Sequence, residues 1–451
     1  MISEGIFRAY DIRGIYGRDL TEEVAEKIGR ALATYVDGEG KTVLVGKDVR
    51  LSSEPLSGSL VGGMLSGGFN VEDIGTVTTP LLYFSSVHYG KDGGVMVTAS
   101  HNPPEWNGFK IWTETGFISM GMGMEALKDL VLEGRFKEAV RGSLRANPNA
   151  IPDYEKYVAE QIEVRQKLRV VADPANGSCC VLIPSIFEKT GIDVVAINAV
   201  PDGTFPVHPP EPNEETLDDL RRLVLDEKAN FGVGFDGDGD RAIFVDDRGR
   251  LVSSTSILVI LAEHYLKKQR GAAMVYEVSC SMSVEETIKA YGGKPVLSRV
   301  GHTYIVDKML REKAAFGGET SGHFYFMDVY GFDDALYASL KIAEVLSKRE
   351  EKLSEIVDSL PSYPRIPITN YECPDERKFQ VVEELAREFA EMGYKTITID
   401  GVKIVEDEGW FLVRPSNTQP LIRLTVEAKN DEALHRLSLI ADEKLKEKTG
   451  S

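Results

Sequence analysis

Residues 41–53 read KTVLVGKDVRLSS, and they begin a pattern that recurs twice more along the 451-residue chain. A β-branched strand ends in a polar turn, a helical stretch follows, and GGFNVEDIGTV (67–77) supplies a glycine and a second strand. LRVVADPANGS (168–178) leads likewise to TGIDVVAINAV (190–200), and GAAMVYEVSCSMS (271–283) leads to YGGKPVLSRVG (291–301). This order is typical of a right-handed parallel βαβ crossover. The chain is therefore expected to be an α/β protein with three similar mixed α/β domains.

Each repeat is followed by a further short strand that ends in an unusual loop. These endings are VMVTASHNPP (95–104), FGVGFDGDGDR (231–241) and AAFGGETSGH (314–323). Ligands of open α/β sheets gather at the carboxyl ends of the strands. The three loops are therefore predicted to converge on one central cleft.

The pattern changes from about Pro364. Residues 376–393 read as an amphipathic helix, 394–417 alternate as hairpins around an Asp400-Gly401 turn, and a last helix starts near Asp431. This indicates a smaller C-terminal α+β domain. The predicted domains are residues 1–147 with the serine loop, 148–250 with the aspartate loop, 251–362 with the Glu319 loop, and 363–451.

Composition excludes several classes of partner. The net charge of −19 repels both nucleic acid and anionic membrane, so neither is an expected partner. Cysteines 179, 180, 280 and 373 match neither a disulfide framework nor a metal knuckle. There is no basic-then-apolar leader and no bilayer-length apolar run, so a cytoplasmic protein is expected. A homo-oligomer is left open.

Two loops carry the main chemistry. Pro103 and Pro104 stop the chain just after Ser100, which therefore sits at a rigid strand exit, although a hydroxyl that caps a turn would look the same. Asp236, Asp238 and Asp240 alternate with glycines and would repel each other without a cation. Oxygen ligands without His or Cys favour Mg²⁺. A solvated acidic turn or a calcium loop is the alternative, but an EF-hand needs a Glu where this chain runs into a strand.

Two further loops are weaker signals. Glu319 and Ser321 suit the hydroxyls of a sugar, and His323 binds or only packs; a flexible polar turn is the alternative. RPSNTQP (414–420) offers a guanidinium, side-chain donors and backbone amides, which suit a phosphate. Ordinary capping would also explain it.

A metal loop, a rigid serine, a hydroxyl-binding loop and a phosphate cradle together describe phosphoryl transfer to a sugar. They resemble the α-D-phosphohexomutase family, which carries TASHNP, DGDGD, GExSGH and RPSNT-like loops in this order. The four matches stand at Ser100, Asp236, Glu319 and Arg414 and cover the chain from end to end. Residues 200–217, VPDGTFPVHPPEPNEETL, resemble the phosphomannomutase/phosphoglucomutase branch.

The resemblance implies a role for each matching residue. Ser100 carries the phosphoryl group and ligates Mg²⁺ together with the three aspartates. The other catalytic positions are His101, Lys110, Arg241 and His302, with His302 or Lys110 as general acid–base. Substrate-binding positions are Tyr10, Arg13, Glu319, Ser321, His323, Arg414, Ser416, Asn417 and Thr418.

The implied reaction is reversible phosphoryl transfer between C1 and C6 of mannose or glucose phosphates, through a bound hexose 1,6-bisphosphate. A hexose phosphate is therefore the expected partner, and glucosamine phosphate is the alternative substrate. There is one departure: Ser279 stands where many relatives have a lysine near the sugar, which puts the sugar contacts of that loop in doubt. A Mg²⁺-dependent phosphatase and a silent sugar-phosphate-binding protein are the rival functions.

Overall fold

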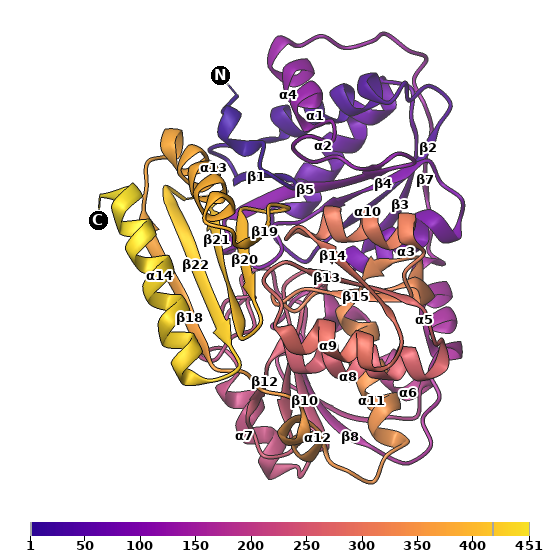
Figure 1. Ribbon diagram of the computed structural model, residues 1–451. Helices are drawn as coiled ribbons and strands as arrows, with labels where there is room; N and C mark the ends of the chain where they lie inside the picture. Colours follow the sequence, from indigo (N-terminus) through magenta and orange to yellow (C-terminus); the bar gives the residue numbers. More distant parts are fainter. Residues whose placement is uncertain (1, 417–418, 451) are drawn as a thin grey trace. The chain divides into compact units, whose positions relative to one another are not determined.

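The computed structural model describes residues 2–416 and 419–450, which form two compact units (Figure 1). One unit contains the chain up to Ile257 together with Ser321–Asp358. The other contains Leu258–Thr320 together with the chain from Ser359 onward. The predicted α/β class, with mixed sheets and a C-terminal antiparallel sheet, is confirmed. The predicted domain boundaries at 147, 250 and 362 stay predictions.

The first sheet has the strand order β1-β5-β4-β2-β3-β7, with β6 paired to β5. Strands β3 and β4 run parallel to β2, whereas β5 is antiparallel to both β4 and β1. The strands are β1 (Ile12–Ile15), β2 (Thr42–Lys47), β3 (Asn70–Thr76), β4 (Gly93–Val97), β5 (Trp106–Thr113), β6 (Gly116–Phe117) and β7 (Leu144–Ala146). The helices are α1 (Glu22–Tyr35), α2 (Ser53–Ser66), α3 (Thr79–His88) and α4 (Met124–Glu133).

The second sheet repeats this arrangement with the order β12-β11-β10-β8-β9. Strand β10 is buried at every residue, runs parallel to β8 and is antiparallel to β11. The strands are β8 (Arg169–Asp173), β9 (Asp193–Ala196), β10 (Phe231–Phe235), β11 (Ala242–Asp246) and β12 (Leu251–Val252). The helices are α5 (Ala150–Glu160), α6 (Ile183–Lys189) and α7 (Asp218–Asp226). In both sheets a fully buried strand, β4 or β10, therefore delivers a polar loop that returns as an antiparallel neighbour.

The third repeat contributes to both units. In the second unit β13 (Ala273–Glu277) is flanked by two parallel strands, β14 (Lys294–Ser298) and β15 (Phe316–Gly318). In the first unit β16 (Phe324–Phe326) and β17 (Phe332–Asp333) form an antiparallel pair. The helices are α8 (Ser254–Lys268), α9 (Met282–Ala290), α10 (His302–Glu312), α11 (Ala335–Ser347) and α12 (Leu353–Ser359).

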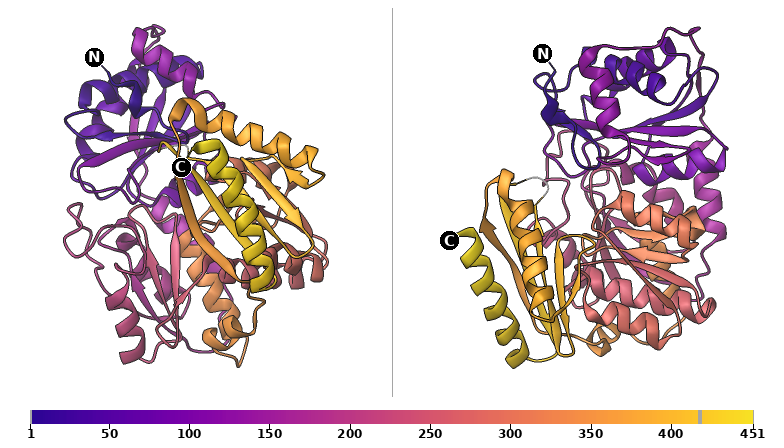
Figure 2. Two further views of the ribbon diagram at one scale, coloured as in Figure 1. Left: turned by 60° about the vertical axis from the view of Figure 1, so that its left-hand side comes forward. Right: turned by 45° about the horizontal axis from the view of Figure 1, so that its top comes forward.

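The fourth sheet is antiparallel throughout, in the order β18-β22-β21-β20-β19. The strands are β18 (Arg365–Glu372), β19 (Lys395–Ile397), β20 (Val402–Glu406), β21 (Gly409–Pro415) and β22 (Leu421–Ala428). Helices α13 (Asp375–Glu391) and α14 (Asp431–Thr449) lie along it (Figure 2). The predicted antiparallel hairpins are present: β19 pairs with β20 across the Asp400-Gly401 turn, and β20 pairs with β21 across the turn between Glu406 and Gly409.

Successive side chains of β21 point to opposite faces of the C-terminal sheet, and both faces are packed. Phe411 and Val413 join the helices α13 and α14 in one apolar cluster. Trp410 and Leu412 point the other way and pack with Val278, which directly follows β13. Within the second unit the C-terminal sheet is thus attached to the strand end of the third repeat.

Among the described residues, no helix combines the length and the apolar character that crossing a membrane requires.

Candidate active site

The serine loop begins where β4 ends, and its backbone is constrained. Ser100 has φ 52°, in the left-handed region that residues with a Cβ rarely adopt. Its amide donates to Oγ1 of Thr98 at 2.9 Å, and the Thr98 hydroxyl in turn donates to Asp48 at 2.7 Å. The surroundings therefore hold Ser100 in a conformation that its own side chain does not favour.

Arg50 fixes the rest of this loop. Its guanidinium is buried and pairs with Asp48 at 3.1 Å. It also donates to four backbone carbonyls of the loop, those of Ser100, Asn102, Pro103 and Trp106, at 2.6–3.1 Å. A planar fork of five donors matches such a curved set of carbonyls, which a lysine would not. These hydrogen bonds hold the loop that follows Ser100, and its predicted rigidity stays a prediction.

The aspartate loop folds around one carboxylate. Oδ1 of Asp236 accepts hydrogen bonds from the backbone amides of Gly239, Asp240 and Arg241 at 3.0, 3.1 and 3.2 Å. This turn brings the side chains of Asp236, Asp238 and Asp240 together, with one carboxylate oxygen from each lying within 4.8 Å of the others. All three are buried.

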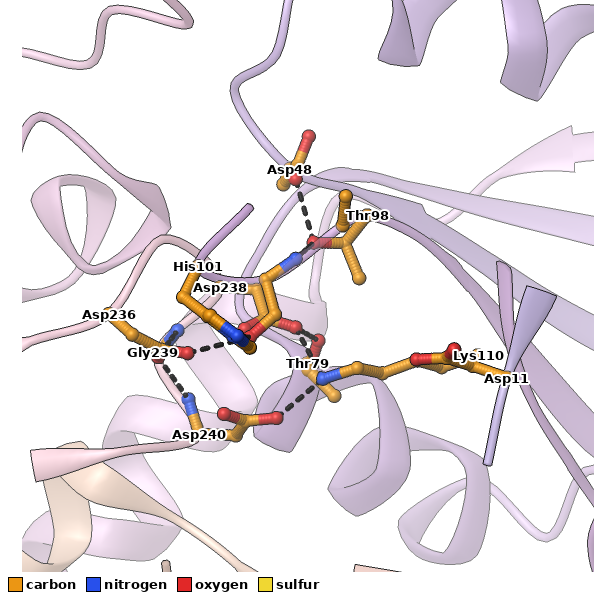
Figure 3. Close-up of polar contacts among 12 residues, drawn as sticks. Asp11, Asp48, Thr79, Thr98, His101, Lys110, Asp236, Asp238, Gly239 and Asp240 are labelled. Carbon is orange, nitrogen blue, oxygen red and sulfur yellow. Dashed lines mark hydrogen bonds and ion pairs between the residues drawn. The ribbon is translucent and has the colours of Figure 1, made fainter. Parts of the chain in front are cut away.

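One side chain from β5 and one from α3 face this group (Figure 3). The ammonium of Lys110, on β5, lies 2.7 Å from Oδ2 of Asp238 and 2.5 Å from Oδ2 of Asp240. The hydroxyl of Thr79, at the start of α3, donates to Oδ2 of Asp238 at 2.5 Å. Among the described residues, Oδ1 of Asp238 has no hydrogen-bond partner although it is buried.

The electrostatics of the group call for a further cation. Burial, together with the neighbouring Asp240 and Asp238, raises the pKa of Asp236 well above its usual range. Burial acts in the same direction on Asp240, but the ion pair with Lys110 and the nearby His323 hold its pKa well below the usual range. Nε of Arg241 lies 3.9 Å from Asp236 and 3.9 Å from Asp240, so two cations, Lys110 and Arg241, face three buried carboxylates. The unpartnered oxygen of Asp238 and the all-oxygen donor set fit a hard divalent cation.

Ser100 lies directly at this group. Its hydroxyl donates to Oδ2 of Asp236 at 2.8 Å and lies 3.1 Å from Nδ1 of His101. The Ser100 side chain is fully buried rather than open to solvent. A phosphoryl group on this oxygen would bring two more negative charges beside Asp236, which again requires a cation.

His101 is held neutral. Its Nδ1 lies 2.6 Å from Nη2 of Arg241, a permanent donor, so this nitrogen accepts. Burial and the charges of Arg241 and Arg13 lower the pKa of His101 to about 2. The ring accepts from Arg241 and is not a cation at neutral pH, while the Ser100 hydroxyl proton goes to Asp236.

Arg13 reaches the same loop from β1. It pairs with Asp11 at 2.7 Å and donates to Oδ1 of Asn102 at 2.8 Å and to the carbonyl of Ala99 at 3.3 Å. Tyr10 is half-buried in the turn before β1, and its substrate role stays a prediction.

Two residues of the GGETSGH loop lie in the first unit, beside the aspartates. Nε2 of His323 is 3.4 Å from Oδ1 of Asp240 and 3.8 Å from Oδ2 of Asp333. Ser321 is exposed, and its hydroxyl lies 2.8 Å from Nδ1 of His323. His323 therefore contacts a predicted metal ligand.

Glu319, from the same loop, lies in the second unit. It is buried, and its Oε1 accepts a hydrogen bond from the amide of Gly301 at 2.7 Å. Gly301 caps the helix α10 that starts at His302. The predicted sugar-binding Glu319 and the predicted acid–base His302 are thus neighbours.

The phosphate loop follows β21 in the second unit. Arg414 pairs with Asp400 at 3.2 Å. Ser416 is buried, its amide donates to the carbonyl of Leu421 at 2.9 Å, and its hydroxyl accepts from the amide of Gln419 at 3.2 Å. Asn417 and Thr418 lie outside the described residues.

Sequence reasoning missed the residues that hold these groups in place. They are Asp48, Arg50, Thr79, Glu277 and Asp400. Asp48 and Arg50 had a visible signal, because two charges follow a buried strand in the quoted stretch GKDVR. Thr79 and Asp400 had none, because Thr79 looks like an ordinary first residue of a helix and Asp400 like an ordinary turn residue.

Comparisons with known proteins agree with this arrangement. Models described as alpha/beta/alpha domains I, II and III of phosphoglucomutase/phosphomannomutase match residues 4–136, 152–249 and 253–363, and the C-terminal domain matches 368–443. The phosphomannomutase/phosphoglucomutase of Pseudomonas aeruginosa is 36% identical over 98% of this chain and 95% of its own. A probable phosphoglucosamine mutase of Methanothermobacter thermautotrophicus is also 36% identical, over 95% of this chain and 94% of its own. A crystal structure of a phosphoglucomutase/phosphomannomutase family protein from Burkholderia thailandensis superposes with a TM-score of 0.92 at 33% identity, covering 99% of this chain and 98% of that one.

Proposed function

Because this chain belongs to the phosphoglucomutase/phosphomannomutase family, we propose that it moves a phosphoryl group between C1 and C6 of mannose and glucose phosphates. Ser100 is the proposed carrier of that group. The observation that supports this most directly is the hydrogen bond from the Ser100 hydroxyl to Asp236, inside a group of three carboxylates. A rigid serine at such a site suits phosphoryl transfer, in which positioning and charge stabilisation do most of the catalysis.

The proposed reaction has two transfers. In the first, a sugar hydroxyl attacks the phosphorus of phosphorylated Ser100; the bond from phosphorus to Oγ breaks, the bond to the sugar oxygen forms, and the hydroxyl proton passes to a base. The product is hexose 1,6-bisphosphate, which stays bound. In the second, Ser100 Oγ takes the other phosphoryl group and the sugar oxygen recovers a proton. The reaction is thus an isomerisation of the hexose phosphate.

Asp236, Asp238 and Asp240 would hold Mg²⁺, which when bound neutralises charge on the transferring phosphoryl group. Lys110 adds a second positive charge. Although burial acts to lower it, Asp238 and Asp240 hold the pKa of Lys110 well above its usual value. Lys110 would therefore donate to phosphoryl oxygens, and His302 or Lys110 is the proposed acid–base for the sugar hydroxyl.

The second unit supplies the proposed recognition of the rest of the substrate. Glu319 would accept from sugar hydroxyls, and Arg414 with Ser416 would bind the phosphate that is not reacting. Glucosamine phosphate is the second candidate substrate, because the relative named a probable phosphoglucosamine mutase is as similar as the one named phosphomannomutase/phosphoglucomutase. A cytoplasmic location fits these charged substrates, and a homo-oligomer stays a prediction.

The test is a peptide-mass determination of the purified protein before and after treatment with glucose 1,6-bisphosphate and Mg²⁺. We expect phosphate on Ser100, discharged by mannose 6-phosphate or glucose 1-phosphate, and no phosphorylated peptide in Ser100→Ala. Discharge by glucosamine 6-phosphate alone would favour the second substrate. Release of inorganic phosphate would indicate a phosphatase, and a Ser100 that never carries phosphate would overturn the proposal.

A further inference from the structure

Glu277, the last residue of β13, is a buried carboxylate that joins two loops of the second unit. It is 1% exposed. Its oxygens accept from the amide of Ser279 at 2.6 Å and from the hydroxyl of Ser279 at 2.6 and 2.7 Å. Oε1 also accepts from the hydroxyl of Thr320 at 2.7 Å and, more weakly, from its amide at 3.3 Å. Four donors therefore converge on one carboxylate, which offsets the cost of burying its charge.

The loop that Thr320 belongs to has little stiffness of its own. Glu319 and Thr320 are preceded by Gly317 and Gly318 and followed by Gly322, which has φ 94°. Glycines leave the backbone many alternative conformations. Strand pairing with β13 ends at Gly318, opposite Tyr276. Beyond that point, Glu319 accepts from the amide of Gly301, and Thr320 donates to Glu277.

The other loop, residues 278–282, is fixed through its main chain by side chains of the C-terminal sheet. Nζ of Lys403 donates to the carbonyl of Val278 at 2.8 Å, and Nη2 of Arg365 donates to the carbonyl of Ser279 at 3.1 Å. Oε1 of Glu427 accepts from the amide of Met282 at 2.8 Å. Three hydrogen bonds to its main chain therefore hold the 278–282 loop in place.

Both cations that hold the 278–282 loop also contact the ring of Trp410. The Lys403 ammonium is 3.8 Å from the ring centroid, and the Arg365 guanidinium is 5.6 Å from it. The indole Nε1 donates to Glu427 at 3.1 Å. The cation–π contacts and the hydrogen bond of the indole fix the orientation of the buried Trp410 ring relative to Lys403, Arg365 and Glu427.

We propose that Glu277 is a positioning residue for sugar recognition: it transmits the fixed position of the 278–282 loop to Thr320 and so holds Glu319 toward the hydroxyls of the hexose. This rests on the proposed function, in which Glu319 binds those hydroxyls. Ser279 serves here as a donor to Glu277 rather than as a group directed at the sugar. A glutamine at 277 would present two donor hydrogens to a set of four donors, so it would lose contacts that the carboxylate makes.

The test compares Glu277→Gln, Thr320→Val and Thr320→Ser with the wild type. KM and kcat are measured with glucose 1-phosphate and mannose 1-phosphate, and Kd for glucose 1-phosphate is measured by calorimetry. Loss of a buried hydrogen bond to a charged acceptor is expected to raise KM and Kd about tenfold in Glu277→Gln and Thr320→Val, with a smaller change in kcat. Thr320→Ser keeps the hydroxyl and is expected to keep most of the wild-type affinity.

Valine has nearly the same shape as threonine, so Thr320→Val still tests the contact between Thr320 and Glu277 if Glu277→Gln folds poorly. Unchanged KM and Kd in folded Thr320→Val would overturn the inference, as would equal losses in Thr320→Ser and Thr320→Val. A wild type that binds glucose 1-phosphate without turnover would refute the proposed reaction, while the comparison of Kd values would still decide the role of Glu277. A wild type that binds neither hexose phosphate would overturn both.

Discussion

Oδ2 of Asp400 accepts a hydrogen bond from Nη1 of Arg414 at 3.2 Å. The same oxygen accepts from the backbone amide of Val300, also at 3.2 Å. Val300 lies two residues before His302, so one carboxylate joins the proposed phosphate-binding arginine to the loop that leads into α10. Asp400 accepts from one of the five N–H donors of the guanidinium, and a phosphate could accept from the others.

Asp400→Asn should weaken phosphate binding. The amide keeps one acceptor oxygen but loses the ion pair, so Arg414 is no longer held in one orientation. We expect KM for the hexose phosphate to rise about fivefold with kcat changed less, since a partly buried charge pair contributes on the order of 1 kcal/mol. Steady-state kinetics with glucose 1-phosphate check this. A KM equal to that of the wild type would show that Arg414 orients itself.

Lys110→Met should change the response of the protein to Mg²⁺. The Lys110 ammonium is the cation that pairs with Asp238 and Asp240 in this structure. Removing one partner of a buried ion pair destabilises a fold by about 3 kcal/mol, so the metal-free variant should melt below the metal-free wild type. Mg²⁺ should then restore more of the Tm in the variant than it adds to the wild type.

Thermal melts in EDTA and in millimolar Mg²⁺ measure this difference. Thr79→Val is a matched variant, because it removes a neutral donor to Asp238 and leaves the charges unchanged. An equal Mg²⁺-induced rise of Tm in Lys110→Met and the wild type would mean that the ammonium and the metal do not share the carboxylates.

Gly237→Ala, in the aspartate loop, should displace the backbone of Ser100. A Cβ at residue 237 would lie 2.5 Å from the carbonyl oxygen of Ser100 and 3.2 Å from Cβ of Pro210. That carbonyl is held by Arg50 at 2.7 Å and cannot retreat without breaking the bond. We expect slower phosphorylation of Ser100 by glucose 1,6-bisphosphate, followed by peptide mass.

Gly58→Ala is the control for that substitution. Gly58 lies inside α2 with no atom in the way of a Cβ, so alanine there should be neutral or slightly stabilising. If Gly237→Ala is phosphorylated at the wild-type rate, the two loops are less tightly packed than the structure indicates.

The chemistry of this site was readable from sequence because it sits in short contiguous loops. Ser100 and the three aspartates follow buried strands, and their residue types and spacing already limit what they do. The support for these residues was not readable. Arg50 reaches Ser100 and Thr79 reaches Asp238 across 50 and 159 positions. The charges of Asp48 and Arg50 stand out after their buried strand, but nothing in that segment names their distant partners, and Thr79 looks ordinary in its own segment. Glu277 ends a strand like any other, and its partners Ser279 and Thr320 become neighbours only through the parallel pairing of β13 and β15.

Asp334→Asn should stabilise the first unit at neutral pH. Asp334 caps α11 by accepting from the amide of Tyr337 at 2.8 Å, and it accepts from the hydroxyl of Tyr154 at 2.6 Å. Burial, only partly offset by the Tyr154 and Tyr337 hydrogen bonds, raises the pKa of Asp334 to about 6. Between about pH 4 and pH 6 the folded state therefore keeps a proton that the unfolded state releases.

This difference in bound protons sets the direction in which stability changes with pH. Stability falls as pH rises through this window, and above pH 6 the full cost of the buried charge is present, on the order of 3 kcal/mol for about two pKa units. Asparagine caps a helix as well as aspartate does and carries no charge. Asp334→Asn should therefore gain Tm at pH 7.5 and lose most of that gain at pH 4. Calorimetric melts at the two pH values, with Tyr154→Phe as the variant that removes only the hydroxyl, distinguish the charge from the hydrogen bond. A gain that is equal at both pH values would show that the charge of Asp334 is not its cause.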